Sequence, residues 1–364
     1  MSLKINIPNE YSKLKAVIVG DFNNTPFPKT INNMDLTFRA FYNDNIMSLL
    51  RETVKCKTNI TLNDVKYLEE DIQGERNEDL DNLAKVLVDF GAIVYRPNGF
   101  TETKEINSPN WTNTSYPAGN VRDNILIVDK YVVETSPHLR GRIFENEQLY
   151  DILYDYFELD KEMKWFKLPQ SSLKEGAVDQ SYFDKGFVPK NRLECVFDAA
   201  QCMLFDEGLI VNVANKNHEL GYDALRRMLP EKIKMYKVSW TDNHIDGVIC
   251  TVAKNTILVN PKYTDKIKDT LPKFMKNYKK IIMEDVERYD NKRDGNIYLA
   301  SEGILINCLC VDNYTVVISD KAVKTIKKLE KLGIEVIPVR FRHSRLYSGG
   351  IHCSTLPLDR YKIV

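Results

Sequence analysis

A short polar turn separates two apolar runs in the stretch Asp246-Gly-Val-Ile-Cys-Thr-Val-Ala-Lys-Asn-Thr-Ile-Leu-Val-Asn260. Valine, isoleucine and threonine favour extended strands, and two such runs joined by a short polar segment predict an antiparallel hairpin. A carboxylate, that of Asp246, stands at the start of the first strand. The same arrangement of an acid followed by a hairpin recurs elsewhere in the chain.

Three other stretches repeat the hairpin pattern. Two of them also start at an acid, Asp123 in 122–134 and Asp198 in 198–212, whereas the copy at 306–319 has no acid. If the hairpins are equivalent elements arranged around an axis, their starts converge. Three carboxylates would then meet in one place.

Amphipathic helices alternate with these hairpins. The spacing of apolar residues predicts helices over 77–90 and 320–332, each stopped by a glycine and followed by a strand, and a looser copy over 222–229. The repeating unit is therefore strand, turn, strand, helix, strand. Several such units predict a closed, radially repeated α/β fold. A doubly wound sheet is disfavoured, because the hairpins are antiparallel and no glycine-rich first turn is present.

Length and charge narrow the classes of function. A chain of 364 residues is long enough for one large α/β unit. Its 51 lysines and arginines balance its 51 aspartates and glutamates, so no net field attracts nucleic acid or an anionic membrane. The densest basic run, 262–280, carries apolar residues among its lysines and predicts a helix with a solvated outer face.

Cysteine usage and the lack of targeting signals predict a soluble, cytoplasmic protein. The seven cysteines are an odd number without framework spacing, which indicates reduced thiols. The first residues contain no apolar leader, and no segment has the length of a membrane span. Cys308 and Cys310 have no second pair at zinc spacing, and no phosphate-binding glycine loop is present. We therefore expect neither a metal nor a nucleotide cofactor.

The segment Tyr347-Ser-Gly-Gly-Ile-His-Cys-Ser-Thr355 places a cysteine among small residues. Its glycines allow close backbone approach, and N–H or cationic groups in such a setting lower the pKa of a thiol. Cys353 is therefore a candidate nucleophile, although most unpaired cysteines are small buried hydrophobes. Alternation along a strand would point His352 away from Cys353, so we expect His352 to pack or hydrogen-bond locally.

A second histidine, His244, lies two positions before Asp246. Convergence of the hairpin starts would bring His244, Cys353 and the three carboxylates into one pocket, a combination suited to acid–base and nucleophilic catalysis. Each residue also has a structural interpretation. Asp123 and Asp198 could cap turns or strand ends, and His244 could be a satisfied interior histidine.

In their order and spacing, these motifs resemble the arginine:glycine amidinotransferase group within the guanidino-group-modifying superfamily. The resemblance covers most of the chain and is carried by the segments 14–20, 122–123, 139–145, 197–200, 244–246 with 259–261, and 348–354. It implies a five-fold pseudosymmetric α/β-propeller of ββαβ units. Residues 1–364 would then form a single catalytic domain.

The resemblance also implies a role for each site residue. Cys353 would be the nucleophile, His244 the general acid and base, and Asp198 the carboxylate that partners this histidine. Asp123 and Asp246 would hold the substrate, because two carboxylates fix a planar guanidinium with its carbon facing the sulfur. The implied reaction moves an amidino group from L-arginine or a related guanidine, through an amidino-cysteine, to an acceptor amine. It needs no cofactor.

Some residues depart from the family pattern. Gln201 replaces an acid after Phe-Asp-Ala-Ala, which should leave the histidine–aspartate pair intact. Tyr263 stands where the glycine-using members carry an arginine that grips the substrate carboxylate. Lys262 or Arg142 could replace that anchor, or the donor could lack a carboxylate.

Two further departures concern the acceptor. Thr241 and Asn243 lie close to His244, where the glycine-using members carry asparagine and methionine. Because these positions shape the acceptor pocket, glycine is not the expected acceptor. The expected partners are a guanidine donor and an amine acceptor, without nucleic acid or membrane. The sequence does not fix the oligomeric state, and a homodimer is compatible with it.

Hydrolysis is the main alternative to transfer. If water replaces the amine, the products are a ureido compound and ammonia, as in an arginine deiminase. The segments 139–145 and 197–200 favour transfer, whereas the small residues after Cys353 are slightly more similar to those of deiminases. A silent binding protein would typically have lost the cysteine or the histidine. A papain-like peptidase has no use for the hairpin carboxylates.

Two stretches lack periodicity. Residues 101–120 and 167–195 are rich in Asn, Pro, Ser and Lys. They are predicted to be long loops over the mouth of the site, with a disordered surface excursion as the alternative for the second.

Overall fold

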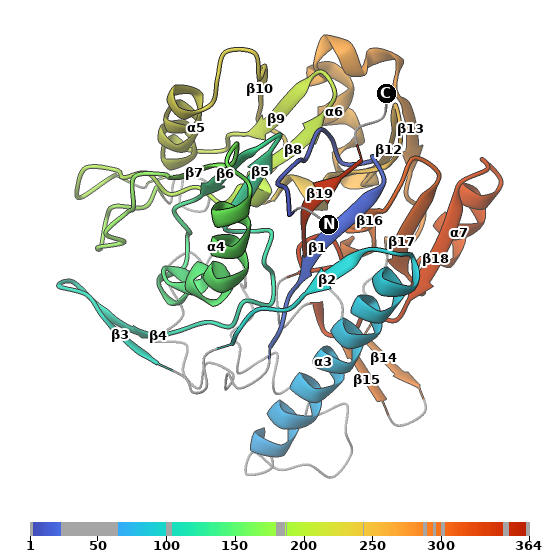
Figure 1. Cartoon of the computed structure of the whole chain (residues 1–364), viewed down its shortest axis with the longest axis horizontal. Helices are drawn as coiled ribbons and strands as arrows, with labels where there is room; N and C mark the ends of the chain where they lie inside the picture. Colours follow the sequence, from blue (N-terminus) through green and yellow to red (C-terminus); the bar gives the residue numbers. More distant parts are fainter. Residues whose placement is uncertain are drawn as a thin grey trace.

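The structure, a computed structural model, describes residues 3–22, 65–99, 104–179, 186, 188–242, 244–286, 290–293, 296–299, 303–344 and 349–361. The fold is α/β, with most strands in the interior of the molecule and helices around its outside (Figure 1). Among the helices of this described part, none has both the length and the apolar character needed to cross a membrane.

The hairpin that follows Asp246 shows how the repeating unit is built. β11 (Ile249–Ala253) pairs antiparallel with β12 (Thr256–Val259). The chain then forms α6 (Thr264–Thr270) and returns as β13 (Lys279–Ile282), which pairs parallel with β12. Two parallel neighbours cannot be joined by a tight turn, so the helical segment supplies the crossover between them.

Three other stretches form the same unit. Each has an antiparallel hairpin, a helix and a third strand that runs parallel to the second. Their elements are β5 (Ile125–Val128), β6 (Tyr131–Glu134), α4 (Tyr150–Leu159) and β7 (Lys164–Lys167); β8 (Cys202–Phe205), β9 (Gly208–Asn212), α5 (Lys216–Met228) and β10 (Met235–Val238); and β16 (Leu309–Cys310), β17 (Thr315–Ser319), α7 (Val323–Glu330) and β18 (Glu335–Val339). The predicted strand, turn, strand, helix, strand unit is therefore confirmed.

A further three-stranded sheet joins distant parts of the chain. β1 (Leu14–Val19) pairs antiparallel with β19 (Thr355–Arg360) and parallel with β2 (Ile93–Tyr95), which follows α3 (Val65–Asp89). This sheet has the same strand arrangement as the others, but its hairpin partners are the first and last strands of the described chain. Two short hairpins, β3 (Glu105–Asn107) with β4 (Thr112–Thr114) and β14 (Asp290–Arg293) with β15 (Asn296–Leu299), lie outside this pattern.

The predicted helices are present, two of them with earlier starts, since the helix predicted over 222–229 corresponds to α5, which begins at Lys216. The helix predicted over 77–90 begins earlier, at Val65, and the helix predicted over 320–332 corresponds to α7. Gly91 and Gly333 follow these helices with φ of 98° and 78°. Such left-handed conformations cost little for glycine and end a helix, as expected.

Two predictions were wrong. The basic run 262–280 is not one helix, because α6 ends at Thr270 and Leu271 is extended, with φ −59° and ψ 134°. Pro272 explains the break, since proline disfavours the helical conformation of the residue before it. The stretch 101–120 contains the β3–β4 hairpin rather than only loop. Most described residues of 167–195 lie outside helices and strands, and their place over the site stays a prediction.

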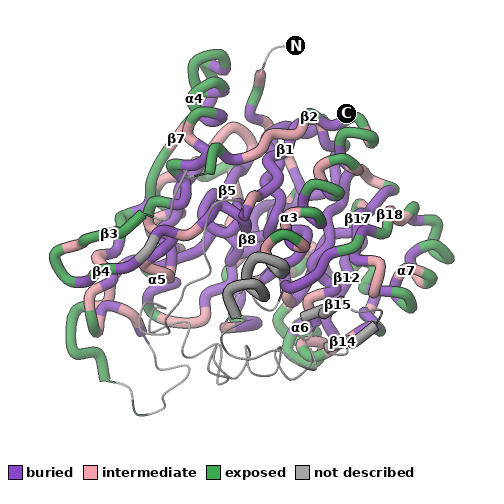
Figure 2. Tube along the Cα trace, turned by 90° about the horizontal axis from the view of Figure 1, so that it is seen from below, coloured by how far each residue is buried: buried purple, intermediate pink, exposed green. Residues whose placement is uncertain are grey.

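Buried residues follow the strands and exposed ones the outer turns of the helices (Figure 2). Every residue of β5, β8, β9 and β12 is buried. Strands buried on both faces read as continuous apolar runs, which is the pattern found in the sequence. The residues at the start of each hairpin are buried as well, so their polar groups must be paired or must bind a ligand.

Candidate active site

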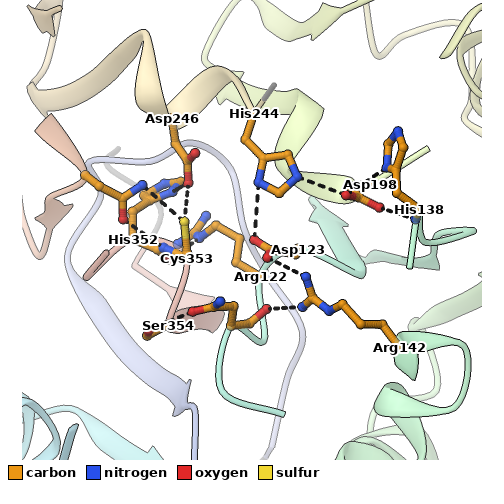
Figure 3. Close-up of polar contacts among 12 residues, drawn as sticks. Arg122, Asp123, His138, Arg142, Asp198, His244, Asp246, His352, Cys353 and Ser354 are labelled. Atoms are coloured by element: carbon orange, nitrogen blue, oxygen red, sulfur yellow. Dashed lines mark hydrogen bonds and ion pairs between the residues drawn. The ribbon is translucent and has the colours of Figure 1, made fainter. Parts of the chain in front are cut away.

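The starts of the hairpins meet, as the sequence predicted. Asp123, Asp198, Asp246 and Cys353 are between 1% and 5% exposed and come shortly before β5, β8, β11 and β19. Main-chain hydrogen bonds join neighbouring starts: the N–H of Ala199 donates to the Asp123 carbonyl at 2.5 Å. Figure 3 shows Cys353 with Asp246 on one side, His244 with Asp198 on the other, and Asp123 between them.

The Cys353 thiol lies between a carboxylate and an amide. Its Sγ is 3.2 Å from Oδ2 of Asp246 and 3.2 Å from Nδ2 of Asn307. Burial, followed by the charges of Asp246 and Asp123, raises the pKa of the thiol well above its ordinary value. The expectation that this segment lowers the thiol pKa is therefore wrong for the ligand-free protein, in which the S–H donates to Asp246.

Asn307 is a site residue that the sequence analysis missed. Its Oδ1 accepts a hydrogen bond from the Cys353 N–H at 3.1 Å, while its Nδ2 donates to the sulfur. The residue stands at the start of the fourth hairpin, the copy without an acid, in the position that corresponds to the three aspartates. The repeat itself was the signal that could have found it.

The two glycines before Cys353 are needed for close approach. A Cβ on Gly350 would lie 2.5 Å from Oδ1 of Asn307, and a Cβ on Gly349 would overlap the Asn120 side chain. A larger residue at position 350 would displace the Asn307 amide that holds the thiol, and one at position 349 would displace the Asn120 side chain. The predicted use of glycine in this segment is confirmed.

His244 bridges two of the carboxylates. Its Nε2 lies 2.9 Å from Oδ2 of Asp198 and its Nδ1 lies 3.7 Å from Oδ1 of Asp123. Burial lowers the pKa of this histidine, but Asp123, Asp198 and Asp246 outweigh burial and raise the pKa to about 9. Burial raises the pKa of Asp198, but its electrostatic interactions and hydrogen bonds with His138 and His244 outweigh burial and hold this pKa well below its ordinary value.

We expect Asp198→Asn to lower the pKa of His244, because the charge that stabilises the imidazolium is removed. A histidine whose pKa rises on folding from 6.5 to about 9 stabilises the fold fully below pH 6.5 and loses this contribution as the pH rises through 9. NMR titration measures the pKa, and urea unfolding should show a larger stability difference between wild type and variant at pH 6 than at pH 9.5. Equal differences at both pH values would contradict this electrostatic assignment.

Only one of the two carboxylate oxygens of Asp123 accepts a hydrogen bond from the described residues. Oδ2 accepts a hydrogen bond from Nη1 of Arg142 at 2.8 Å, whereas Oδ1 is buried and accepts no hydrogen bond from any residue that the structure describes. Burial raises the pKa of Asp123, against the opposing charge of Arg142. A buried acceptor without a donor is costly, so Oδ1 is suited to a cationic ligand that brings its own N–H groups.

Arg142 is engaged with groups of the protein itself. Its guanidinium is buried and donates to Asp123, to the Asn120 carbonyl and, in a bidentate pair, to Glu145. An arginine so engaged within the protein has few N–H groups left for a substrate carboxylate. Its contact supports Asp123, and the role of Arg142 as a substrate anchor stays a prediction.

The prediction for His352 was wrong in its geometry. Residues 351–354 form a turn, and β19 starts only at Thr355, so strand alternation does not apply. Nδ1 of His352 lies 2.9 Å from Oδ2 of Asp246, the oxygen that also contacts Cys353. Its Nε2 lies 3.7 Å from Glu10. Burial lowers the pKa of His352, but these acidic contacts raise it to about 9.

The structure describes most of the remaining residues that the sequence analysis singled out. Thr241 is buried, and its hydroxyl lies 3.4 Å from that of Tyr263, so two departures from the family pattern contact each other. Asn243 lies outside the described residues. Lys262 is exposed, with its Nζ 5.7 Å from the Tyr263 ring centroid. The side chain of Gln201 accepts a hydrogen bond from Asn212 at 2.8 Å, and its main-chain N–H donates to the Asp198 carbonyl at 3.0 Å.

A second histidine, also missed in the sequence, contacts Asp198. Nδ1 of His138 lies 2.9 Å from Oδ2 of Asp198. It comes directly before the segment 139–145 and has no periodic pattern around it. Within the described stretches, no group of three or more histidine, cysteine or acidic side chains is arranged to hold a metal ion.

Comparisons with known proteins identify chains that are similar to this one. A family model described as arginine deiminase matches residues 226–360. An inosamine-phosphate amidinotransferase 1 from Streptomyces glaucescens is 29% identical over 292 residues, covering 79% of this chain and 80% of that protein. An L-arginine:L-lysine amidinotransferase from Pseudomonas savastanoi pv. phaseolicola is 27% identical over 291 residues, covering 78% of each chain.

A solved structure extends the similarity to the whole fold. The inosamine-phosphate amidinotransferase from Streptomyces griseus superposes with a TM-score of 0.79 at 25% identity, covering 100% of this chain and 99% of that chain. In sequence and in fold, this α/β protein is thus similar to amidinotransferases, and the resemblance described from the sequence is confirmed.

Proposed function

We propose that this protein transfers an amidino group from L-arginine or a related guanidine to an acceptor amine through a covalent amidino-Cys353. The observation that carries the proposal is the Cys353 thiol, buried against Asp246 and Asn307 and separated by Asp123 from the His244–Asp198 pair. The named activity of the relatives supports transfer. The five similar three-stranded sheets support a five-bladed propeller that forms one catalytic domain.

Substrate binding would start the reaction. A guanidinium donates N–H groups to Oδ1 of Asp123 and to Asp246, and its positive charge offsets the two charges that raise the thiol pKa. The S–H proton then passes from Cys353 to solvent, and the thiolate remains beside the amide of Asn307. The sulfur faces the guanidinium carbon.

Two bond exchanges follow. The Cys353 sulfur forms a bond to the guanidinium carbon, and the C–N bond to the leaving amine breaks as the His244 imidazolium gives that amine a proton. The neutral His244 then takes a proton from the acceptor amine, which attacks the amidino carbon. The C–S bond breaks, and the thiol is restored with a proton from solvent.

A deiminase remains the second candidate, because the arginine deiminase model matches residues 226–360. With arginine and a panel of amines that includes lysine, we expect ornithine and a new guanidino compound without matching ammonia. Chromatography of the amino acids and an ammonia assay in the same reactions measure both outcomes. Citrulline and stoichiometric ammonia would select hydrolysis and reject transfer.

A further inference from the structure

A chain of histidines extends behind Asp198, away from His244. Oδ2 of Asp198 contacts Nδ1 of His138 at 2.9 Å, and Oδ1 accepts the main-chain N–H of His138 at 3.2 Å. Nε2 of His138 lies 2.8 Å from Nε2 of His218, a fully buried residue of α5. The two imidazole planes are nearly perpendicular, at 89°.

One main-chain group fixes the protons along this chain. Nδ1 of His218 accepts the N–H of Ala214 at 3.2 Å, so this nitrogen carries a lone pair. A neutral His218 therefore has its proton on Nε2 and donates it to Nε2 of His138. His138 must then be neutral as well, with its own proton on Nδ1, where it donates to Asp198. Burial lowers the pKa of His218 well below its ordinary value, in agreement with a neutral ring.

The protonation of His138 determines which nitrogen of His244 can exchange a proton with a substrate. Because the N–H groups of His138 donate to both oxygens of Asp198 and its ring is held neutral, the carboxylate keeps its charge and its orientation. Nε2 of His244 then always donates to Asp198. A proton that His244 exchanges with a substrate must therefore enter and leave through Nδ1. This nitrogen lies 3.7 Å from Asp123, where a guanidinium would bind.

We propose that His138 is a positioning residue: the His218–His138 pair holds Asp198 against Nε2 of His244 and thereby directs proton exchange with the substrates to Nδ1. This role rests on the proposed function. It predicts that hydrogen bonds run in one fixed direction from the Ala214 N–H to Asp198, which accepts from His138 on one side and from His244 on the other.

Two substitutions at His138 separate positioning from packing. His138→Phe keeps a ring but removes the donor to Asp198, whereas His138→Asn places an amide N–H near the position of Nδ1. We expect His138→Phe to lower kcat about 10- to 100-fold, as loss of a supporting hydrogen bond commonly does. KM for the donor should stay the same, because Asp123 and Asp246 are untouched. His138→Asn should recover most of kcat. Full activity of His138→Phe, or equal losses in both variants, would overturn the proposal.

A spectroscopic measurement tests the same idea without turnover. With ring nitrogens labelled in the five histidines, NMR distinguishes protonated from unprotonated nitrogens. We expect a neutral His138 with Nδ1–H and a neutral His218 with Nε2–H from pH 6 to 8, assigned through the single variants. A positively charged His138 in that range, or a proton on its Nε2, would refute the proposal. If the wild type turns over no guanidine, the proposed function fails, and the NMR result alone decides the role of His138.

Discussion

Replacing Cys353 by alanine is expected to abolish turnover while leaving the fold intact. The Cys353 sulfur is the atom to which the amidino group would be attached, and none of the other described cysteines hydrogen-bonds the Asp246 carboxylate or the Asn307 amide. In the wild type, incubation with the donor alone should add the mass of an amidino group to the peptide that contains Cys353. Adding the acceptor amine should remove this adduct.

The matched control for this experiment is Cys195→Ala. Cys195 is also buried and unpaired, and burial raises the pKa of its thiol to about 11, but it does not contact the three site carboxylates. This variant should keep its activity. Near-normal turnover in Cys353→Ala, or an adduct on a different cysteine, would remove the covalent mechanism.

Replacing Asp246 by asparagine should separate the reactivity of the thiol from catalysis. The substitution removes one of the two charges that would hold the guanidinium, and we expect kcat/KM to fall at least about 10³-fold, as when one partner of a buried charge pair is deleted. It also removes a negative charge beside Cys353, so the pKa of the thiol should fall towards its ordinary value. At neutral pH, Cys353 should therefore react faster with iodoacetamide, even though turnover is lost.

Peptide mass spectrometry after timed alkylation measures the reactivity of Cys353 separately from the other cysteines. Asp269→Asn, at an exposed position of α6, removes the same charge far from the thiol and should change neither alkylation nor turnover. Slower alkylation in Asp246→Asn would show that the carboxylate does not hold the thiol in its protonated form.

Much of the fold followed from local patterns. The hairpins were predictable because apolar strands with short polar turns leave little choice of structure, and the repeat made their starts converge. Pro272 was visible in the sequence, but the apolar spacing of 262–280 was given more weight than the break that proline imposes. The turn at 351–354 was mistaken for strand because glycine and small residues give no periodic signal.

The site was less predictable where contacts depend on tertiary structure. The three aspartates stood out because each begins a hairpin, whereas Asn307 was overlooked because it is not an acid. His138 follows a proline outside any helix or strand, and only the folded chain brings it against Asp198. Arg142 is attractive as a substrate anchor in the sequence, but a residue's partners within the protein cannot be read from a motif.

The pairing of β1 with β19 bears on how the protein becomes functional during biosynthesis. Leu14 lies opposite Arg360, so β1 cannot complete this pairing until β19 has been synthesised. Contacts between such distant residues form slowly, because a long loop must close first. Cys353 lies two residues before β19, and a nascent chain therefore has the histidine and the aspartates well before it has the thiol. The candidate site is therefore complete only after the segment that carries Cys353 and β19 has been made.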